Sequence, residues 1–100
     1  MFIAMNRFTV KRERESEFVT MWKTRESHLD GVPGFERFNL LRGPEGDGSV
    51  VYATHTEWRD EGAFRSWVES AAFKKAHQGA RPDPDMFAGP NVLEMFTSVI

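Results

Sequence analysis

FIAMNRFTV, at residues 2–10, alternates between two sets of side chains. One set is Phe2, Ala4, Asn6, Phe8 and Val10, and the other is Ile3, Met5, Arg7 and Thr9. A period of two over this length predicts a β-strand whose two sets point to opposite faces of a sheet. Because each set includes large apolar side chains, we expect both faces of that sheet to be covered.

A helix is expected next along the chain. Three glutamates between residues 13 and 17 precede a stripe at helical spacing: Phe18, Met21, Trp22, Arg25 and Leu29. The acids suit the positive end of the helix dipole, and Arg25 and His28 in the last turn suit its negative end. The segment from Gly31 to Gly34, with Pro33 between, then stops the helix.

Two strands follow. Phe35 to Arg42 is predicted to be a strand by its aromatic and leucine content, and Val50 to Trp58 is β-branched and aromatic. The glycine-rich segment Gly43 to Gly48 between them predicts a turn.

The last part of the chain is expected to contain two consecutive helical segments separated by a break, then a loop and a strand. Asp60 is a suitable N-cap for a helix that carries Phe64, Trp67 and Val68. Ser70 is a suitable cap for a new helical start, since residues 71–80 have their own stripe: Phe73, Ala76, His77 and Ala80. A loop from Arg81 to Pro90 then leads to a strand from Asn91 to Ile100.

The predicted order βαββαβ is the ferredoxin-like arrangement, an α+β fold with one antiparallel sheet and both helices on one face. We expect residues 1–100 to form a single domain. Ile3 and Met5 would lie on the face without helices, and nothing else in the chain is left to cover them. A second copy is therefore expected to cover that face, which predicts a two-fold homodimer and a dimeric α/β barrel.

Composition excludes several classes of protein. The net charge is −2, whereas nucleic-acid binding needs a clustered basic surface. There are no cysteines, so disulfides, thiolate metal sites and cysteine nucleophiles are excluded. No apolar run has the length of a membrane span, and residues 1–10 lack the pattern of a secretory leader. These features together predict a cytoplasmic protein.

Asn6 is the first candidate site residue. Its amide shares a strand face with apolar side chains, and an unpartnered buried amide costs about 1–3 kcal/mol. Either it bonds to nearby backbone in the core, or it is directed at a ligand in a cavity.

His77 and Trp67 are the other candidates. A neutral imidazole is a common axial donor to haem iron, and one histidine leaves the sixth position open. A lone helical histidine is, however, more often a satisfied or surface residue. Trp67 reads as a core aromatic on spacing alone. On one straight helix it would lie about 80° and roughly 15 Å from His77, so both can border one cavity only if the helix breaks at Ser70.

Other motifs point to no second site. His28 and His55 lack the short His/Glu spacing of zinc sites, and no G-x-S-x-G elbow or Gly-rich phosphate loop is present. The cations Lys74, Lys75 and Arg81 are most simply a solvated face, with one of them a possible partner of a haem propionate.

Four segments of the chain together resemble the antibiotic-biosynthesis-monooxygenase superfamily, and within it the IsdG-type haem-degrading monooxygenases. They are FIAMNRFTV, PGF at Pro33 to Phe35, THTEW at Thr54 to Trp58, and AFRSWVESAAFKKAH at Ala63 to His77. The likeness runs from residue 2 to about residue 80. The run W-x-x-S-x-x-F-x-x-x-H with a strand-one Asn is its specific part, whereas PGF occurs across the wider superfamily.

The resemblance implies that Asn6, Trp67 and His77 form the functional set. His77 would be the proximal iron ligand, Asn6 would hydrogen-bond the iron-bound oxygen species on the distal side, and Trp67 would press on the macrocycle and expose a meso carbon. Haem would be both substrate and prosthetic group. The protein would use O2 and electrons from an external, NAD(P)H-dependent reductase to cleave the porphyrin ring and release iron. The loop from Arg81 to Pro90 is the least matched part, so propionate contacts are not implied.

Two other functions stay open. One is a cofactor-free monooxygenase acting on a quinol or phenol, a different branch of the same superfamily that has no need of an axial histidine. The other is a haem carrier or storage protein that binds haem without turnover.

Overall fold

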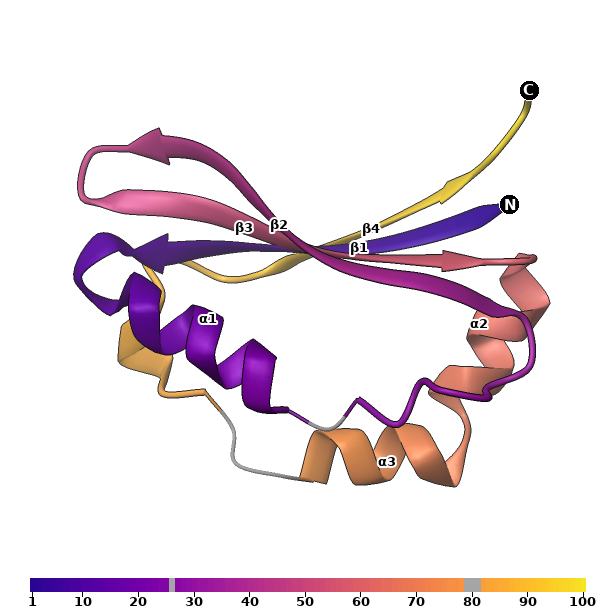
Figure 1. The fold of residues 1–100 in the computed structure, drawn as a ribbon. Helices are drawn as coiled ribbons and strands as arrows, with labels where there is room; N and C mark the ends of the chain where they lie inside the picture. Colours follow the sequence, from indigo (N-terminus) through magenta and orange to yellow (C-terminus); the bar gives the residue numbers. More distant parts are fainter. Residues whose placement is uncertain (26, 79–81) are drawn as a thin grey trace.

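The computed structural model describes residues 1–25, 27–78 and 82–100 (Figure 1). In chain order its elements are β1 (Phe2–Lys11), the 3₁₀ turn η1 (Arg12–Arg14), α1 (Glu15–Thr24), β2 (Phe35–Gly46), β3 (Ser49–Trp58), α2 (Glu61–Val68), α3 (Ala71–Gln78), the 3₁₀ turn η2 (Pro84–Met86) and β4 (Val92–Thr97). The strands form one antiparallel sheet in the order β2-β3-β1-β4. All three α-helices lie on one face of it (Figure 1). The predicted ferredoxin-like α+β fold is confirmed.

Strand β1 lies in the middle of the sheet, between β3 and β4, and its predicted alternation is confirmed. Phe2, Ala4 and Val10 are buried beneath the helices, whereas Arg7 on the other face is exposed. Asn6 is opposite Thr54 of β3 and Leu93 of β4. Asn6 therefore lies near the centre of the helix-covered face.

The core beneath the helices divides into two clusters at opposite ends of the sheet. One gathers Leu29, Trp58 and Trp67 under α2 and α3. The other gathers Val10 and Phe18 with their neighbours under α1. Because large side chains fill the two ends, the middle of the sheet face is left to the residues of the site.

Helix α1 is shorter than predicted. It ends at Thr24, and Arg25 is extended (φ −74°, ψ 133°), so the expected last turn with Arg25 and His28 is wrong. The Thr24 hydroxyl donates to the carbonyls of Thr20 and Met21, a local bonding pattern by which side chains compete with the helical ladder. Leu29 still reaches the core, but from non-helical backbone.

The turn and the last strand also differ from the prediction. Strand β2 continues to Gly46 through an irregularity between Arg42 and Glu45, so the turn is far shorter than the expected Gly43 to Gly48. Strand β4 runs only over Val92–Thr97 and not over Asn91 to Ile100. The last residue of β4, Thr97, pairs with Phe2, the first residue of β1, and beyond it the Ser98 N–H donates to the Met1 carbonyl at 2.9 Å.

The break between α2 and α3 is confirmed. The Asp60 carboxylate accepts from the Ala63 N–H at 2.8 Å, and the Ser70 hydroxyl accepts from the Phe73 N–H at 3.1 Å, so both predicted caps are formed. The Ser70 hydroxyl also donates to the Trp67 carbonyl at 2.6 Å. The predicted helix end at Ala80 lies outside the described residues.

The segment before β4, expected as an irregular loop, is tied to the body of the protein. It contains η2, and Met86 is buried in the core cluster around Phe18. The Ala88 N–H donates to the Thr9 carbonyl at 2.9 Å, and Phe87 forms a β-bridge with Val10. This segment therefore enters β4 from a defined position. No helix in the described part of the chain is long and apolar enough to cross a membrane.

Candidate functional site

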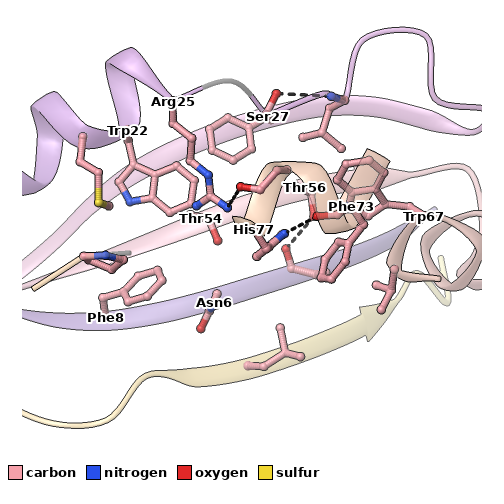
Figure 2. A pocket seen from close by; sticks show the side chains of 18 of the residues that line it. Asn6, Phe8, Trp22, Arg25, Ser27, Thr54, Thr56, Trp67, Phe73 and His77 are labelled. Carbon is pink, nitrogen blue, oxygen red and sulfur yellow. Dashed lines mark hydrogen bonds between the residues drawn. The ribbon is translucent and has the colours of Figure 1, made fainter. Parts of the chain in front are cut away.

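A cavity of about 430 Å³ lies between the two core clusters, beneath the middle of the sheet. Figure 2 shows its arrangement: Asn6 lies on β1, Trp22 and Arg25 enter from the end of α1, and Trp67, Phe73 and His77 enter from α2 and α3. The structure thus brings Asn6, Trp67 and His77 to one cavity, although they come from three separate elements.

The His77 imidazole has a defined orientation. Its Nδ1 lies 2.8 Å from the Phe73 carbonyl oxygen, and its ring stacks on that of Phe73 at 4.0 Å between centroids. Because a carbonyl oxygen only accepts, Nδ1 donates this hydrogen bond, and in the neutral ring Nε2 has the lone pair that a metal ligand needs. The side chain is exposed and lines the cavity.

Trp67 is part of the core and part of the cavity wall. It is 7% exposed and packs on Trp58 at 6.3 Å and on Phe73 at 5.6 Å between ring centroids. Phe73 therefore touches both Trp67 and His77. The break at Ser70 has the consequence expected from the sequence: residues of α2 and α3 line the same cavity.

Asn6 is half-buried and has a side-chain partner. Its Oδ1 accepts a hydrogen bond from Asn91 Nδ2 at 2.8 Å. The sequence suggested either backbone or a ligand as the hydrogen-bond partner of the Asn6 amide, and it did not indicate a second asparagine.

Arg25 and Trp22 are site residues that sequence reasoning missed. The Arg25 guanidinium lies 4.6 Å from the centre of the Trp22 ring and donates to the Ala76 carbonyl at 3.1 Å, which joins the end of α1 to α3. Burial lowers the pKa of Arg25. Both residues lie on the predicted apolar stripe of the first helix. That position is the feature of the sequence that could have identified them as site residues. Their use in a cavity wall depends on the early end of α1.

The other polar candidates lie away from the cavity. Lys74 and Lys75 are exposed on α3 and do not line it, and Arg81 lies outside the described residues. Neither His28 nor His55 lines the cavity. His55 follows Thr54 in β3 and therefore lies on the other face of the sheet. Within residues 1–25, 27–78 and 82–100, no three His, Asp or Glu side chains gather where they could hold a metal ion.

Comparison with known proteins relates this geometry to one family. The model of the family described as antibiotic biosynthesis monooxygenase matches residues 1–79. A haem oxygenase (staphylobilin-producing) of Staphylococcus epidermidis is 28% identical over 85 residues, which cover 85% of this chain and 81% of that protein.

Solved structures show the same fold. The haem-degrader MhuD of Mycobacterium tuberculosis, with two haems bound in its active site, is 28% identical and superposes with a TM-score of 0.76, covering 100% of this chain and 97% of that one. SnoaB of Streptomyces nogalater, a cofactor-independent oxygenase, is 27% identical with a TM-score of 0.58, covering 99% and 93%.

Proposed function

Because the chain belongs to the antibiotic biosynthesis monooxygenase family, we propose that it is a haem-degrading monooxygenase that holds haem iron through His77. The observation that carries this proposal is the His77 ring: Nδ1 bonds to the Phe73 carbonyl, and the other nitrogen is left for a metal at the edge of an apolar cavity. Similarity to a staphylobilin-producing haem oxygenase and to a haem-bound MhuD structure supports it.

The described residues fit haem in their apolar surface and in donor type. The cavity volume lies in the ordinary range for small-molecule sites, and eight of its described lining side chains are Phe or Trp. Arg25 is the one cation among its described lining residues, so it is suited to a haem propionate. A flat apolar ring with an acidic edge and a metal centre matches this set of groups.

Each site residue then has a role that follows from its position. His77 would hold the iron through Nε2, because Nδ1 is engaged by the Phe73 carbonyl, which also orients the ring. The Asn6 amide would donate a hydrogen bond to a ligand in the cavity. Trp67, which packs against Trp58 and Phe73, would be held in contact with the bound ring. When bound, haem supplies both the iron that activates O2 and the ring that is oxidised.

The electrons for this reaction come from outside the chain. The sequence has no Gly-rich phosphate loop of the kind that binds a dinucleotide, so we assign the electron supply to a separate NAD(P)H-dependent reductase. The apolar cavity walls and the covering helices limit the access of water to the ring.

The working unit is proposed to be a homodimer that joins the helix-free faces of two sheets (Figure 1). Ile3 and Met5 are on that face, and Phe96, opposite Ile3, is 49% exposed. The buried Nδ1 of His55, on the same face, has no hydrogen-bond partner among the described residues. A second copy would cover the apolar side chains and supply a polar neighbour.

Two alternatives are separated from the proposal by one experiment. The similarity to SnoaB supports a cofactor-free oxygenase as an alternative function, although its TM-score of 0.58 is lower than the 0.76 for MhuD. The experiment adds stoichiometric haem to the protein and then a reductant under air. We expect a histidine-ligated haem spectrum that bleaches with release of iron. A stable haem spectrum would indicate a carrier, and no spectral change would indicate a protein without a haem site.

A further inference from the structure

We infer that Asn91 is a positioning residue: it holds the Asn6 amide so that the NH2 group, and not the oxygen, is presented to the cavity. The observation is the 2.8 Å hydrogen bond from Asn91 Nδ2 to Asn6 Oδ1. This inference rests on the proposed function, since it concerns how Asn6 faces a ligand bound beneath the sheet.

The sheet register explains why these two residues meet. Asn6 is paired with Leu93 of β4, and Asn91 is the residue just before that strand, two positions before Leu93. It is therefore a diagonal neighbour of Asn6, within reach of a side chain across the strand pair. Leu93 itself lines the cavity beside Asn6.

The backbone of Asn91 is held from both sides. Before it, the β-bridge of Phe87 with Val10 and the bond from the Ala88 N–H to the Thr9 carbonyl attach the segment to β1. After it, β4 pairs with β1 from Val92 onward. Asn91 thus meets Asn6 from a backbone position that is set before any ligand binds.

The orientation matters because the two ends of a carboxamide have opposite hydrogen-bonding properties. An amide without a fixed partner can turn by 180° and present either end. In the structure Asn91 donates through Nδ2, so Asn6 offers its oxygen to Asn91 and keeps its own NH2 for the cavity. A group that stabilises developing negative charge has to donate, and preorganisation of that donor is the larger part of its effect.

The bond is tested first in the protein without haem. Side-chain amide resonances of Asn91 are followed by NMR in the full chain and in Asn6→Ala. We expect slowed hydrogen exchange of the Asn91 amide protons and a shift of their resonances on Asn6→Ala. Free exchange and unmoved resonances would overturn the inference while leaving the haem assignment intact.

The role is tested with carbon monoxide as the probe on the reduced haem complex. A distal donor lowers the C–O stretching frequency, so Asn91→Ala should raise it toward the value for Asn6→Ala. The side chain in Asn91→Asp has the same shape, but its carboxylate only accepts hydrogen bonds. It should therefore turn the Asn6 amide round and raise the C–O stretching frequency above that of Asn91→Ala. Met95→Ala, a truncation on the same face of β4 outside the cavity lining, is the matched control and should change nothing. An Asn91→Ala frequency equal to that of the parent would overturn the role.

Turnover completes the test through a double-mutant cycle. Loss of a partner that orients a site residue typically costs roughly 10- to 100-fold, and we expect that loss in Asn91→Ala with haem affinity retained. If Asn91 acts through Asn6, the double variant Asn6→Ala/Asn91→Ala is no slower than Asn6→Ala alone. Additive losses would contradict a positioning role. Absence of haem binding by the parent would defeat the proposed function instead, and the NMR result would still report on the bond.

Discussion

The Nδ1 atom of His77 lies 2.8 Å from the carbonyl oxygen of Phe73, one helical turn earlier in α3, and the two rings stack at 4.0 Å. The same phenylalanine packs edge-on against Trp67 of α2 at 5.6 Å. Phe73 therefore sets the tautomer of His77 through its backbone and the plane of His77 through its ring, and it joins the two helices that line the cavity.

His77→Ala is expected to fold but to lose the axial ligand and all turnover, because no other histidine lines the cavity in the described part of the chain. The absorption spectrum of the haem complex and the rate of haem loss measure the effect, and added imidazole should restore the ligand. His28→Asn is the control, since Asn tolerates the positive φ of 58° at that position. A histidine-type spectrum with turnover in His77→Ala would show that the assignment of the ligand is wrong.

Asn6→Ala is expected to separate binding from chemistry. Haem affinity should be nearly unchanged, because it depends on the iron–His77 bond and on burial of the ring. Turnover should fall by roughly 10²–10³, the usual effect of removing one preorganised donor. The thermal midpoint should be little changed, since Asn91 is exposed and can bond to water instead. Intact turnover with lowered stability would instead identify Asn6 as a structural residue.

Met5→Glu is expected to turn a dimer into a monomer. Burial of apolar area between the sheet faces contributes roughly 25 cal/mol per Å², and a charge on that face opposes it. Sedimentation at micromolar concentration measures the change, and Lys74→Glu on the exposed surface of α3 serves as the control. A monomeric parent protein would disprove the dimer.

Gly34→Ala is expected to destabilise the fold by about 1–3 kcal/mol. Gly34 has φ +82°, and an added Cβ would overlap the Cβ of Ala63 in α2. Gly31 has φ +80° with open space around it, so Gly31→Ala carries only the backbone cost, about 1–2 kcal/mol. Urea unfolding of the two variants measures the difference, and equal losses would contradict the close approach of Gly34 to α2.

Tyr52→Phe is expected to alter the pH dependence of stability at both ends of the pH range. Burial, and then its hydrogen bond to Glu15, raises the pKa of Tyr52, so this contribution to stability is present below about pH 10 and is lost as pH rises through the folded pKa. Hydrogen bonds from Arg42 and Tyr52 lower the pKa of Glu15, so its contribution is lost as pH falls.

The free energy of unfolding of the parent should therefore fall at alkaline pH more steeply than that of Tyr52→Phe, and its loss at acid pH should also be larger. Arg42→Met, which removes the other donor to Glu15, should reduce the acid effect. Because Arg42 lowers the pKa of Tyr52, its removal should enlarge the alkaline loss of stability and not reduce it. Identical pH profiles for all three proteins would contradict the coupling of Tyr52 to Glu15.

The local pattern of the sequence determined most of the fold. The alternation of residues 2–10 was enough to predict β1 and its buried face, and the Asp60 and Ser70 caps located the starts of α2 and α3, because strand alternation and N-caps depend on neighbouring residues alone. The three candidate site residues were also singled out in the sequence, and the family resemblance then implied that they form one functional set.

Only the tertiary structure decided how the cavity is walled. Arg25 leaves the helical path and reaches the Ala76 carbonyl 51 residues further along the chain. Asn91 meets Asn6 across 85 residues, through a strand register that neither segment encodes alone. Both contacts join residues that are distant in sequence, and their formation depends on where packing places the intervening chain. Periodicity and capping describe single helices and strands, so they do not predict which side chains come into contact when those elements pack together.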